Sequence, residues 1–334
     1  MSTSPINIGF LLFPGFSMMA LASAFEPLRA ANRLSGSSRY RWYLLSVQGD
    51  LVESSSGLSL ATQSIDEGIE LDRLFVIASL DIQPLKDRRI FSCLQRFAAR
   101  GRVLGAISNG SFILARAGLL DGYRCTVHWE SIPEFSEEFP KISTRREIFV
   151  TDRNRWTCAG GIAAIDLMLN QVTTDCSPQL AAEVVDQFLV GRIRGPEEHQ
   201  RLEIQQRFGI NDKRIVSAIA CMEQNFEETV DVHEIARLCN LSLRQMERLW
   251  RHHFELSPQK FYIQLRLKEA QRLLRESTDS ISAIALKCGF VSTSHMGSAY
   301  RALFGCSPSD ERKHRASHHS TGISSRSNKG IIDS

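Results

Sequence analysis

One pattern occurs twice towards the carboxyl end of this 334-residue chain, and it constrains the fold more than any other feature. The first copy spans residues 236–258 and the second spans residues 285–308, each running from an Ala to a Ser-Pro pair. The left part of the pattern repeats after 49 residues and the right part after 50. A repeat of this length indicates one supersecondary unit that is used twice.

Each copy predicts two helices joined by a tight turn. Ala236 is small enough for two helices to cross closely, and Asn240 tolerates the positive φ of a turn. Ser242 is a good N-cap for the helix that follows. The second copy has equivalent residues, which are Ala285, Gly289 and Ser292.

The second helix of the first copy has one apolar and one polar face. Apolar residues recur there at helical spacing, at Leu243, Met246, Leu249, Trp250 and Phe254. The opposite face carries Arg244, Gln245, Glu247, Arg248 and Arg251. In a helix-turn-helix unit this outer face lies in the major groove of DNA. The alternative is the solvated surface of an ordinary helical pair, but two copies in register favour DNA binding.

The carboxyl-terminal third of the chain resembles the DNA-binding domain of AraC-family transcription regulators. The residues that carry this resemblance are 231–258, 265–274 and 284–308. It implies two helix-turn-helix units joined by a long helix, for which residues 265–276 are suitable. The two units would then enter successive major grooves, about one helical turn apart.

The resemblance also suggests which side chains contact DNA. We expect Arg244, Gln245 and Arg248 to contact base edges, each bidentate pair contributing about 1–3 kcal/mol of discrimination. Any of them, like Arg251, could instead contact phosphate. In the second unit Gly297 and Ser298 stand where many relatives have a basic residue, so less stringent base recognition is expected there. Its corresponding face consists of Ser292, Thr293, Ser294 and His295.

The charge distribution agrees with a polyanionic partner. The whole chain has a net charge of only +3, but residues 237–315 hold 14 Lys and Arg against 7 Asp and Glu. That segment is therefore +7 and the remainder −4, a balance that suits nucleic acid or, alternatively, a soluble helical surface.

Cysteine usage and the amino terminus indicate the compartment. None of the 8 Cys forms a Cys-x-x-Cys pair, so a zinc site is not expected and the thiols are predicted to be buried. No signal peptide or membrane span is recognisable, so we expect a protein of the reducing cytoplasm that does not bind a membrane. No cofactor is expected either.

The front of the chain alternates strand-like and helix-like segments. Strands are predicted at residues 6–13, 42–47, 74–78 and 103–107, and helices at residues 17–32, 88–100 and 112–117. Shorter strands follow at 125–127, 149–151 and 156–158, with helices at 162–172 and 179–190. This alternation predicts a parallel sheet covered on both faces.

The front segment resembles the PfpI-like, class I glutamine-amidotransferase-like domain, an α/β domain of the flavodoxin-like kind. The residues that carry the resemblance are 105–115, 117–122, 126–129, 158–161 and 166–169. A subgroup of AraC-family regulators carries this domain in front of the DNA-binding one. Residues 26–36, with Tyr40 and Trp42, are most similar to members that control catabolism of small nitrogen compounds, including amino acids and quaternary amines.

We therefore expect an effector-sensing domain at residues 1–192, a linker at 193–212 and an all-α double helix-turn-helix domain at 213–315. Residues 316–334 have almost no apolar side chains and are predicted to be a disordered tail. His314, His318 and His319 lie in or beside this tail, and no functional metal site is expected there.

Enzymes of the superfamily place a Cys nucleophile at the turn after a strand, and the matching residue here is Ser108. The carboxylate usually supplied by the first helix is replaced by Ala20, whereas His128 is retained. Serine needs a base to remove its proton, so a hydrolase or amidase using Ser108 and His128 is the rival hypothesis. Otherwise Ser108 caps the next helix and His128 starts the helix at Trp129.

A ligand site could persist without catalysis. Ligands of parallel sheets bind at the carboxyl ends of the strands, where Ser108, Asn109 and His128 are expected. Trp129 could offer an aromatic face to a cation or simply be packed. Glu26 could pair with an ammonium group or be solvated.

These features together predict a ligand-responsive transcription regulator, an activator of a catabolic operon and not an enzyme. Its expected partners are promoter DNA, RNA polymerase, a small amino-acid-like or quaternary-amine effector and a second copy of the chain. A module that binds only other proteins is the remaining alternative.

Overall fold

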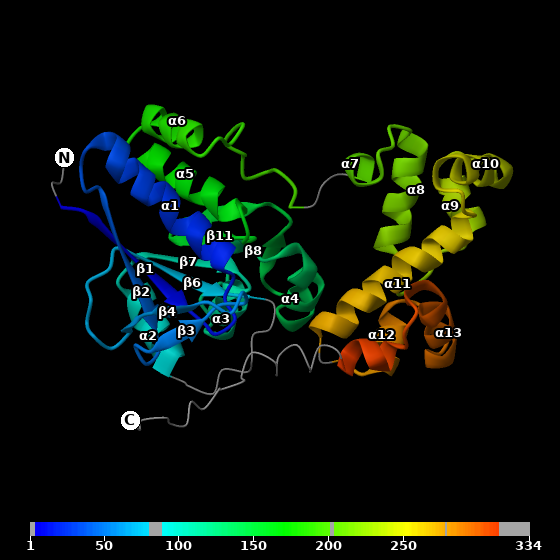
Figure 1. Cartoon of the computed structure of the whole chain (residues 1–334), viewed down its shortest axis with the longest axis horizontal. Coiled ribbons are helices and arrows are strands. Elements are labelled where there is room, and N and C mark those ends of the chain that lie inside the picture. Colours follow the sequence, from blue (N-terminus) through cyan, green and yellow to red (C-terminus); the bar gives the residue numbers. More distant parts are fainter. Residues whose placement is uncertain (1–3, 80–88, 201–203, 278, 314–334) are drawn as a thin grey trace, which may run out of the picture. The chain divides into compact units, whose positions relative to one another are not determined.

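The computed structural model describes residues 4–79, 89–200, 204–277 and 279–313. The chain divides into two units, residues 1–201 and 202–334, which are both drawn in Figure 1. The predicted tail at 316–334 and the three histidines at 314, 318 and 319 lie outside the described residues.

The first unit is built on a seven-stranded sheet in the order β10-β11-β7-β6-β1-β2-β5. Neighbouring strands are parallel except for the antiparallel pair at one edge, β10 with β11. The strands are β1 (Ile6–Leu12), β2 (Tyr40–Ser46), β5 (Gln63–Ser64), β6 (Arg73–Ala78), β7 (Val103–Ser108), β10 (Phe149–Asp152) and β11 (Arg155–Cys158). The predicted parallel sheet is thus confirmed.

Two small strand pairs flank the main sheet. They are β3 (Leu51–Glu53) with β4 (Ser59–Ala61), and β8 (Arg124–Thr126) with β9 (Ser143–Arg145). The sequence indicated only β8 among these four, because the other three are mostly exposed and lack an apolar run.

Helices cover both faces of the sheet, as Figure 1 shows. One face packs against α1 (Met18–Ser35), α5 (Ala163–Asp175) and α6 (Pro178–Gln187), and the other against α2 (Arg89–Ala99) and α3 (Gly110–Arg116). The alternation of side chains along each strand produces two cores. In β6, for example, Phe75 and Ile77 lie in the core with α1, whereas Leu74 and Val76 lie in the core with α2.

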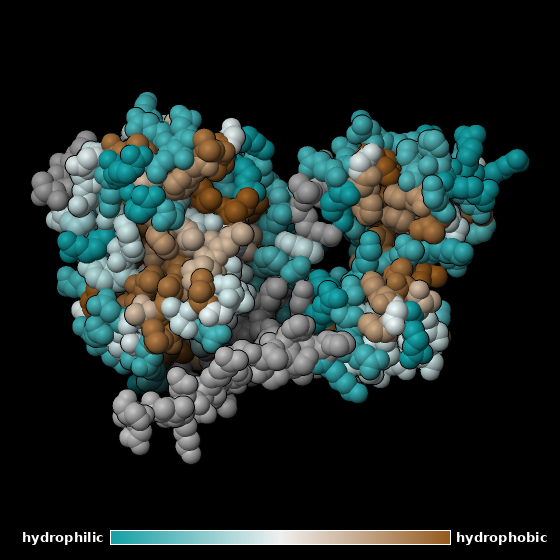
Figure 2. All heavy atoms as spheres, viewed as in Figure 1, coloured by the Kyte–Doolittle hydropathy of each residue, from teal (hydrophilic) through white to brown (hydrophobic). Residues whose placement is uncertain are grey.

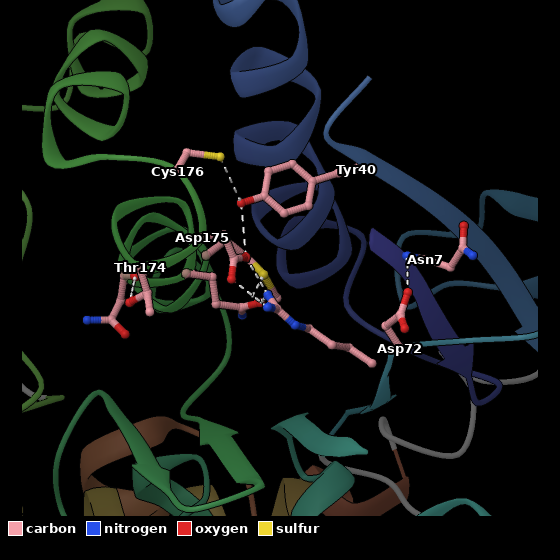
Figure 3. Close-up of polar contacts among 10 residues, drawn as sticks. Asn7, Tyr40, Asp72, Thr174, Asp175 and Cys176 are labelled. Carbon is pink, nitrogen blue, oxygen red and sulfur yellow. Dashed lines mark hydrogen bonds and ion pairs between the residues drawn. The ribbon is translucent and has the colours of Figure 1, made fainter. Parts of the chain in front are cut away.

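A buried polar network fixes the end of α5 to the amino-terminal edge of the sheet (Figure 3). Arg73 donates two hydrogen bonds to the Asp175 carboxylate, at 2.7 and 2.6 Å, and a third to Gln171. Tyr40 donates to the same carboxylate at 3.0 Å, and burial beside this charge raises the pKa of its hydroxyl. Parallel strands start at this end of the sheet, so the network lies at the opposite end from the carboxyl ends of the strands, where ligands of such sheets bind.

The second unit is entirely helical in its described residues. Its helices are α7 (Ile204–Phe208), α8 (Lys213–Gln224), α9 (Val232–Leu238), α10 (Leu243–Phe254), α11 (Pro258–Glu276), α12 (Ile281–Lys287) and α13 (Thr293–Phe304). One core forms around Met246 and Trp250, and a second forms around Met296 and Tyr300. The long helix α11 contributes Leu265 to the first core, and it contributes Leu267, Ala270 and Leu274 to the second.

Hydrophobic residues reach the surface of each unit in separate areas surrounded by hydrophilic ones (Figure 2). Across the described parts of the chain, no helix has both the length and the apolar character needed to span a bilayer. The eight cysteines are all free thiols. Cys125, Cys158 and Cys288 are buried, but the other five are partly exposed, so the prediction of uniformly buried thiols is wrong for those five.

Candidate functional site

The first helix-turn-helix unit consists of α9 and α10. The turn between them passes through Asn240, whose φ is +55°, and is closed by a hydrogen bond from the Leu241 N–H to the Ala236 carbonyl at 2.9 Å. Ala236 and Leu241 are both buried, which locks the two helices together. The predicted role of Asn240 in a left-handed turn is therefore confirmed.

The second unit, α12 and α13, has the same construction. The Phe290 N–H donates to the Ala285 carbonyl at 2.8 Å, and Gly289 has a φ of +66°. A Cβ at Gly289 would lie 2.2 Å from the Phe226 carbonyl oxygen, so this turn requires glycine for space as well as for conformation.

The long helix α11 holds the second turn directly. The Arg266 guanidinium donates to the carbonyls of Cys288 and Gly289, at 2.7 and 2.5 Å, and lies 4.3 Å from the centre of the Phe290 ring. Arg266 is buried, and burial lowers the pKa of its guanidinium. Near its other end, the Tyr262 hydroxyl donates to the Asn225 carbonyl. These contacts fix α11 to the second turn through Arg266 and to the end of α8 through Tyr262.

The outer face of α10 carries exposed arginines. Met246 and Trp250 point into the core, whereas Arg244, Arg248 and Arg251 are exposed. None of these three arginines makes an ion pair within the described residues, in contrast to Arg237 on α9, which pairs with Glu234. Three unpaired guanidinium groups on one helical face can bind phosphate or guanine.

Gln245 has a second role that the sequence analysis missed. Its side-chain oxygen accepts a hydrogen bond from the Ser242 backbone N–H at 2.9 Å, while Ser242 caps the Gln245 N–H. This reciprocal capping box was recognisable from the Ser-x-x-Gln spacing. A bidentate contact with adenine would need the same oxygen, so Gln245 would have to leave the cap to make it.

The corresponding face of α13 is exposed but almost uncharged. Thr293, Ser294 and His295 are exposed at its first turn, and Ser292 accepts a hydrogen bond from the His295 N–H at 3.1 Å as N-cap. The His295 ring lies edge-on to Phe290, with 5.5 Å between centroids. The two units therefore offer different chemistry on equivalent surfaces.

In the amino-terminal unit of the chain, residues 1–201, Ser108 lies at the sharp turn where β7 meets α3. Its φ is +58°, a strained value for a residue other than glycine. A Cβ at Gly110 would lie 2.2 Å from the Val76 carbonyl oxygen, and a Cβ at Gly160 would lie 2.7 Å from that of Ser108. Two glycines thus make room for the strained turn.

Asn109 connects this turn to the segment around His128. Its side-chain nitrogen donates to the Ser131 hydroxyl at 2.9 Å, and Ser131 ends the short 3-10 helix Trp129–Ser131, ahead of α4 (Ile132–Glu138). The side-chain oxygen of Asn109 is buried and accepts no hydrogen bond within the described residues. His128 lies at the start of the 3-10 helix, with Nδ1 3.4 Å from a Glu130 carboxylate oxygen.

The catalytic arrangement of the superfamily is not assembled here. No hydrogen bond joins the Ser108 hydroxyl to His128 among the described residues. Ala20 is completely buried in the core and brings no carboxylate. Glu26 is on α1, where it forms an ion pair with Arg29 at 2.7 Å, and within the described residues no hydrogen bond or ion pair joins it to the other four predicted ligand residues. The structure therefore connects the turn at Ser108 and Asn109 to the 128–131 segment through the Asn109–Ser131 hydrogen bond, and it pairs Glu26 with Arg29.

Residues 194–200, which we call the strap, are bound to the first unit. The buried Asp166 carboxylate at the start of α5 accepts hydrogen bonds from the backbone and side chain of Arg194. The Gln200 amide donates to Thr126 and to the carbonyls of Val127 and Glu147. Sequence analysis placed these residues in a linker, because no pattern in their own composition indicates burial.

Comparisons with known proteins match both units of the chain. Residues 7–174 match the DJ-1/PfpI family, and residues 235–314 match a helix-turn-helix domain. The chain is 42% identical to the HTH-type transcriptional regulator GbdR of Pseudomonas aeruginosa over 311 residues, which span 93% of this chain and 85% of that protein. The chain belongs to the AraC family of transcription regulators, in the group with an amino-terminal DJ-1/PfpI domain.

Other AraC-family regulators give the same result. CdhR of Pseudomonas aeruginosa is 42% identical over 304 residues, covering 91% of this chain and 90% of CdhR. A crystal structure of an AraC family transcriptional regulator from Pseudomonas putida matches 55% of this chain and 100% of its own, with 34% identity and a TM-score of 0.52. The curated relatives are named as transcriptional regulators, which supports a non-enzymatic role for the DJ-1/PfpI domain of this AraC-family chain.

Proposed function

We propose that this protein is a metabolite-responsive transcription regulator that activates a catabolic operon in the cytoplasm. The observation that carries the proposal is the pair of helix-turn-helix units held in register by α11, with unpaired arginines on the outer face of α10. Promoter DNA is the polyanion that this face would bind. RNA polymerase and a second copy of the chain are the protein partners that this role implies.

Each predicted contact residue has a part in this proposal. Arg244 and Arg248 contact base edges, and Arg251 contacts the DNA backbone. Gln245 contacts DNA through its side-chain nitrogen while its oxygen stays in the capping box. In the second unit Ser292 to His295 approach the next major groove. Gel-shift titration at fixed salt with the full chain tests this role, because a specific site must bind more tightly than a random duplex of equal length.

We propose that the effector binds beside Ser108, Asn109, His128 and Trp129. The Asn109 side-chain oxygen has no hydrogen-bond partner within the described residues, and a buried acceptor without a partner destabilises the protein. An effector with an N–H donor would supply this partner once a local movement exposes the oxygen. An amino acid provides such a donor in its ammonium group, whereas a quaternary amine does not. Glu26 would receive an ammonium group only if it left Arg29.

Thermal denaturation of the full chain distinguishes these effector classes. Amino acids and their trimethylated derivatives are compared at equal concentration, because a ligand present at 100 times its Kd stabilises the folded form by about 2.7 kcal/mol. The proposal predicts a larger shift with the amino acid and its loss in Asn109→Ala. Stabilisation by the trimethylated form alone would show that Asn109 does not provide the contact.

The rival hydrolase hypothesis receives no support from the geometry. Ser108 lacks a hydrogen-bonded base among the described residues, and the buried Ala20 replaces the carboxylate that assists catalysis in the enzymes. A domain that keeps the strained turn without the catalytic partners is suited to ligand binding.

A further inference from the structure

The two helix-turn-helix units differ by one inserted residue, Val291. In the first unit the buried Leu241 is followed at once by the N-cap Ser242. In the second unit Val291 stands between the buried Phe290 and the N-cap Ser292. This insertion is the reason why the repeat offset changes from 49 to 50 residues.

Val291 is 92% exposed. Burying a valine side chain would stabilise the folded protein by about 1.5–3 kcal/mol, and this position forgoes that contribution. It immediately precedes the amino terminus of α13, and Thr293 and Ser294 beside it are also exposed. The equivalent part of α10 offers the guanidinium group of Arg244 instead. The exposed groups of Val291, Thr293 and Ser294 at this end of α13 are therefore methyl and hydroxyl groups, and none of these three side chains is cationic.

The amino-terminal end of a recognition helix is the part that meets base edges in the major groove. Among the four bases only thymine presents a methyl group there, and apolar side chains recognise it by direct contact. We propose that Val291 contacts the 5-methyl group of a thymine and makes the second unit specific for that base. This inference rests on the proposed DNA-binding function and assigns a base preference to the less charged unit.

The expected contribution is modest and measurable. Removing one methyl-sized group from water contributes about 0.8 kcal/mol, which corresponds to about a fourfold change in affinity at 25 °C. The inserted position makes this contact possible, because it extends the chain beyond the N-cap without disturbing the cap itself. The Ser292 side chain still accepts the His295 N–H at 3.1 Å.

The test is a double-mutant cycle on protein and DNA. Duplexes that bind the full-length protein are first selected from a random library. Each thymine of a selected duplex is then replaced by deoxyuridine, which keeps base pairing and removes only the methyl group. We expect one thymine, in the part of the site protected by the second unit, whose replacement weakens binding about fourfold. Val291→Ala should bind the thymine duplex about fourfold more weakly and should lose nothing further with deoxyuridine.

Three outcomes overturn the inference. If deoxyuridine weakens DNA binding by Val291→Ala as much as binding by the parent protein, the Val291 methyl groups do not contact the thymine 5-methyl group. If Val291→Ala binds DNA normally but lowers transcription in vitro, the residue contacts RNA polymerase instead. If no sequence is selected at all, the proposed function fails and the inference fails with it. Leu189→Ala, at a residue 93% exposed in the first unit of the chain, is the matched control and should behave like the parent protein.

Discussion

Arg194 donates three hydrogen bonds to the Asp166 carboxylate, one from its backbone N–H at 3.0 Å and two from its guanidinium at 3.0 and 2.6 Å. The Asp166 side chain is 3% exposed and that of Arg194 is 29% exposed. Asp166 lies six residues after Gly160, the glycine that borders Ser108. The other end of the strap lies beside the proposed effector site, because Gln200 donates to the Val127 carbonyl next to His128.

Arg194→Ala should destabilise the first unit by roughly 2–3 kcal/mol. The cost of an unpaired buried charge is about 3–5 kcal/mol, and the partial exposure of Arg194 reduces it. Urea unfolding followed by circular dichroism measures the change. Arg192→Ala is the matched control, because Arg192 is 69% exposed and its ion pair with Glu198 should contribute almost nothing. Equal effects of the two substitutions would contradict the assignment.

Arg248→Ala should weaken binding to a selected operator at least tenfold. Loss of a bidentate base contact costs about 1–3 kcal/mol, and loss of a phosphate contact also lowers affinity. The salt concentration is held constant in a gel-shift assay, since affinity for DNA depends steeply on it. Arg96→Ala, which removes an exposed arginine from α2, provides the control. Unchanged affinity of Arg248→Ala would remove this residue from the interface.

Ser108→Ala should leave both folding and DNA binding intact. The Ser108 hydroxyl has no hydrogen-bond partner among the described residues, so its removal is expected to change stability by less than about 1 kcal/mol. Gly160→Ala should be clearly destabilising, because Gly160 has a φ of +94° and a new Cβ would lie 2.7 Å from the Ser108 Cβ. Thermal melting and gel-shift titration of both variants test this contrast. An esterase or amidase activity abolished by Ser108→Ala would instead support the rival enzyme.

The fold of the helical carboxyl-terminal unit was predicted well from the sequence, because the residues that indicate its turns and helix caps act locally. Ala236, Asn240 and Ser242 each act on their immediate neighbours, and the repeat showed them twice. The parallel sheet was also predictable, since β1, β6 and β7 are apolar and bounded by turns. In contrast, β5 and β9 are short and depend on strands that are distant in the sequence. Their pairing could not be predicted from their own residues.

The same reasoning explains what the sequence missed at the candidate sites. The position of Ser108 at a strained turn was expected from its motif, but its separation from a catalytic base depends on tertiary structure. Asp166 looked like an ordinary polar residue at the start of a helix, and only the folded chain brings Arg194 to it. Nothing in the sequence marks Val291 as exposed, and only the folded structure shows that it is 92% exposed.

The most direct test of the central claim is selection of bound fragments from the organism's own genomic DNA by the purified full-length protein. The account predicts that a few fragments are enriched and share a sequence in two parts, separated by about one helical turn of 10–10.5 base pairs. Enrichment should be lost in Arg248→Ala. Uniform recovery of genomic and random duplexes, both with and without candidate metabolites, would contradict the account.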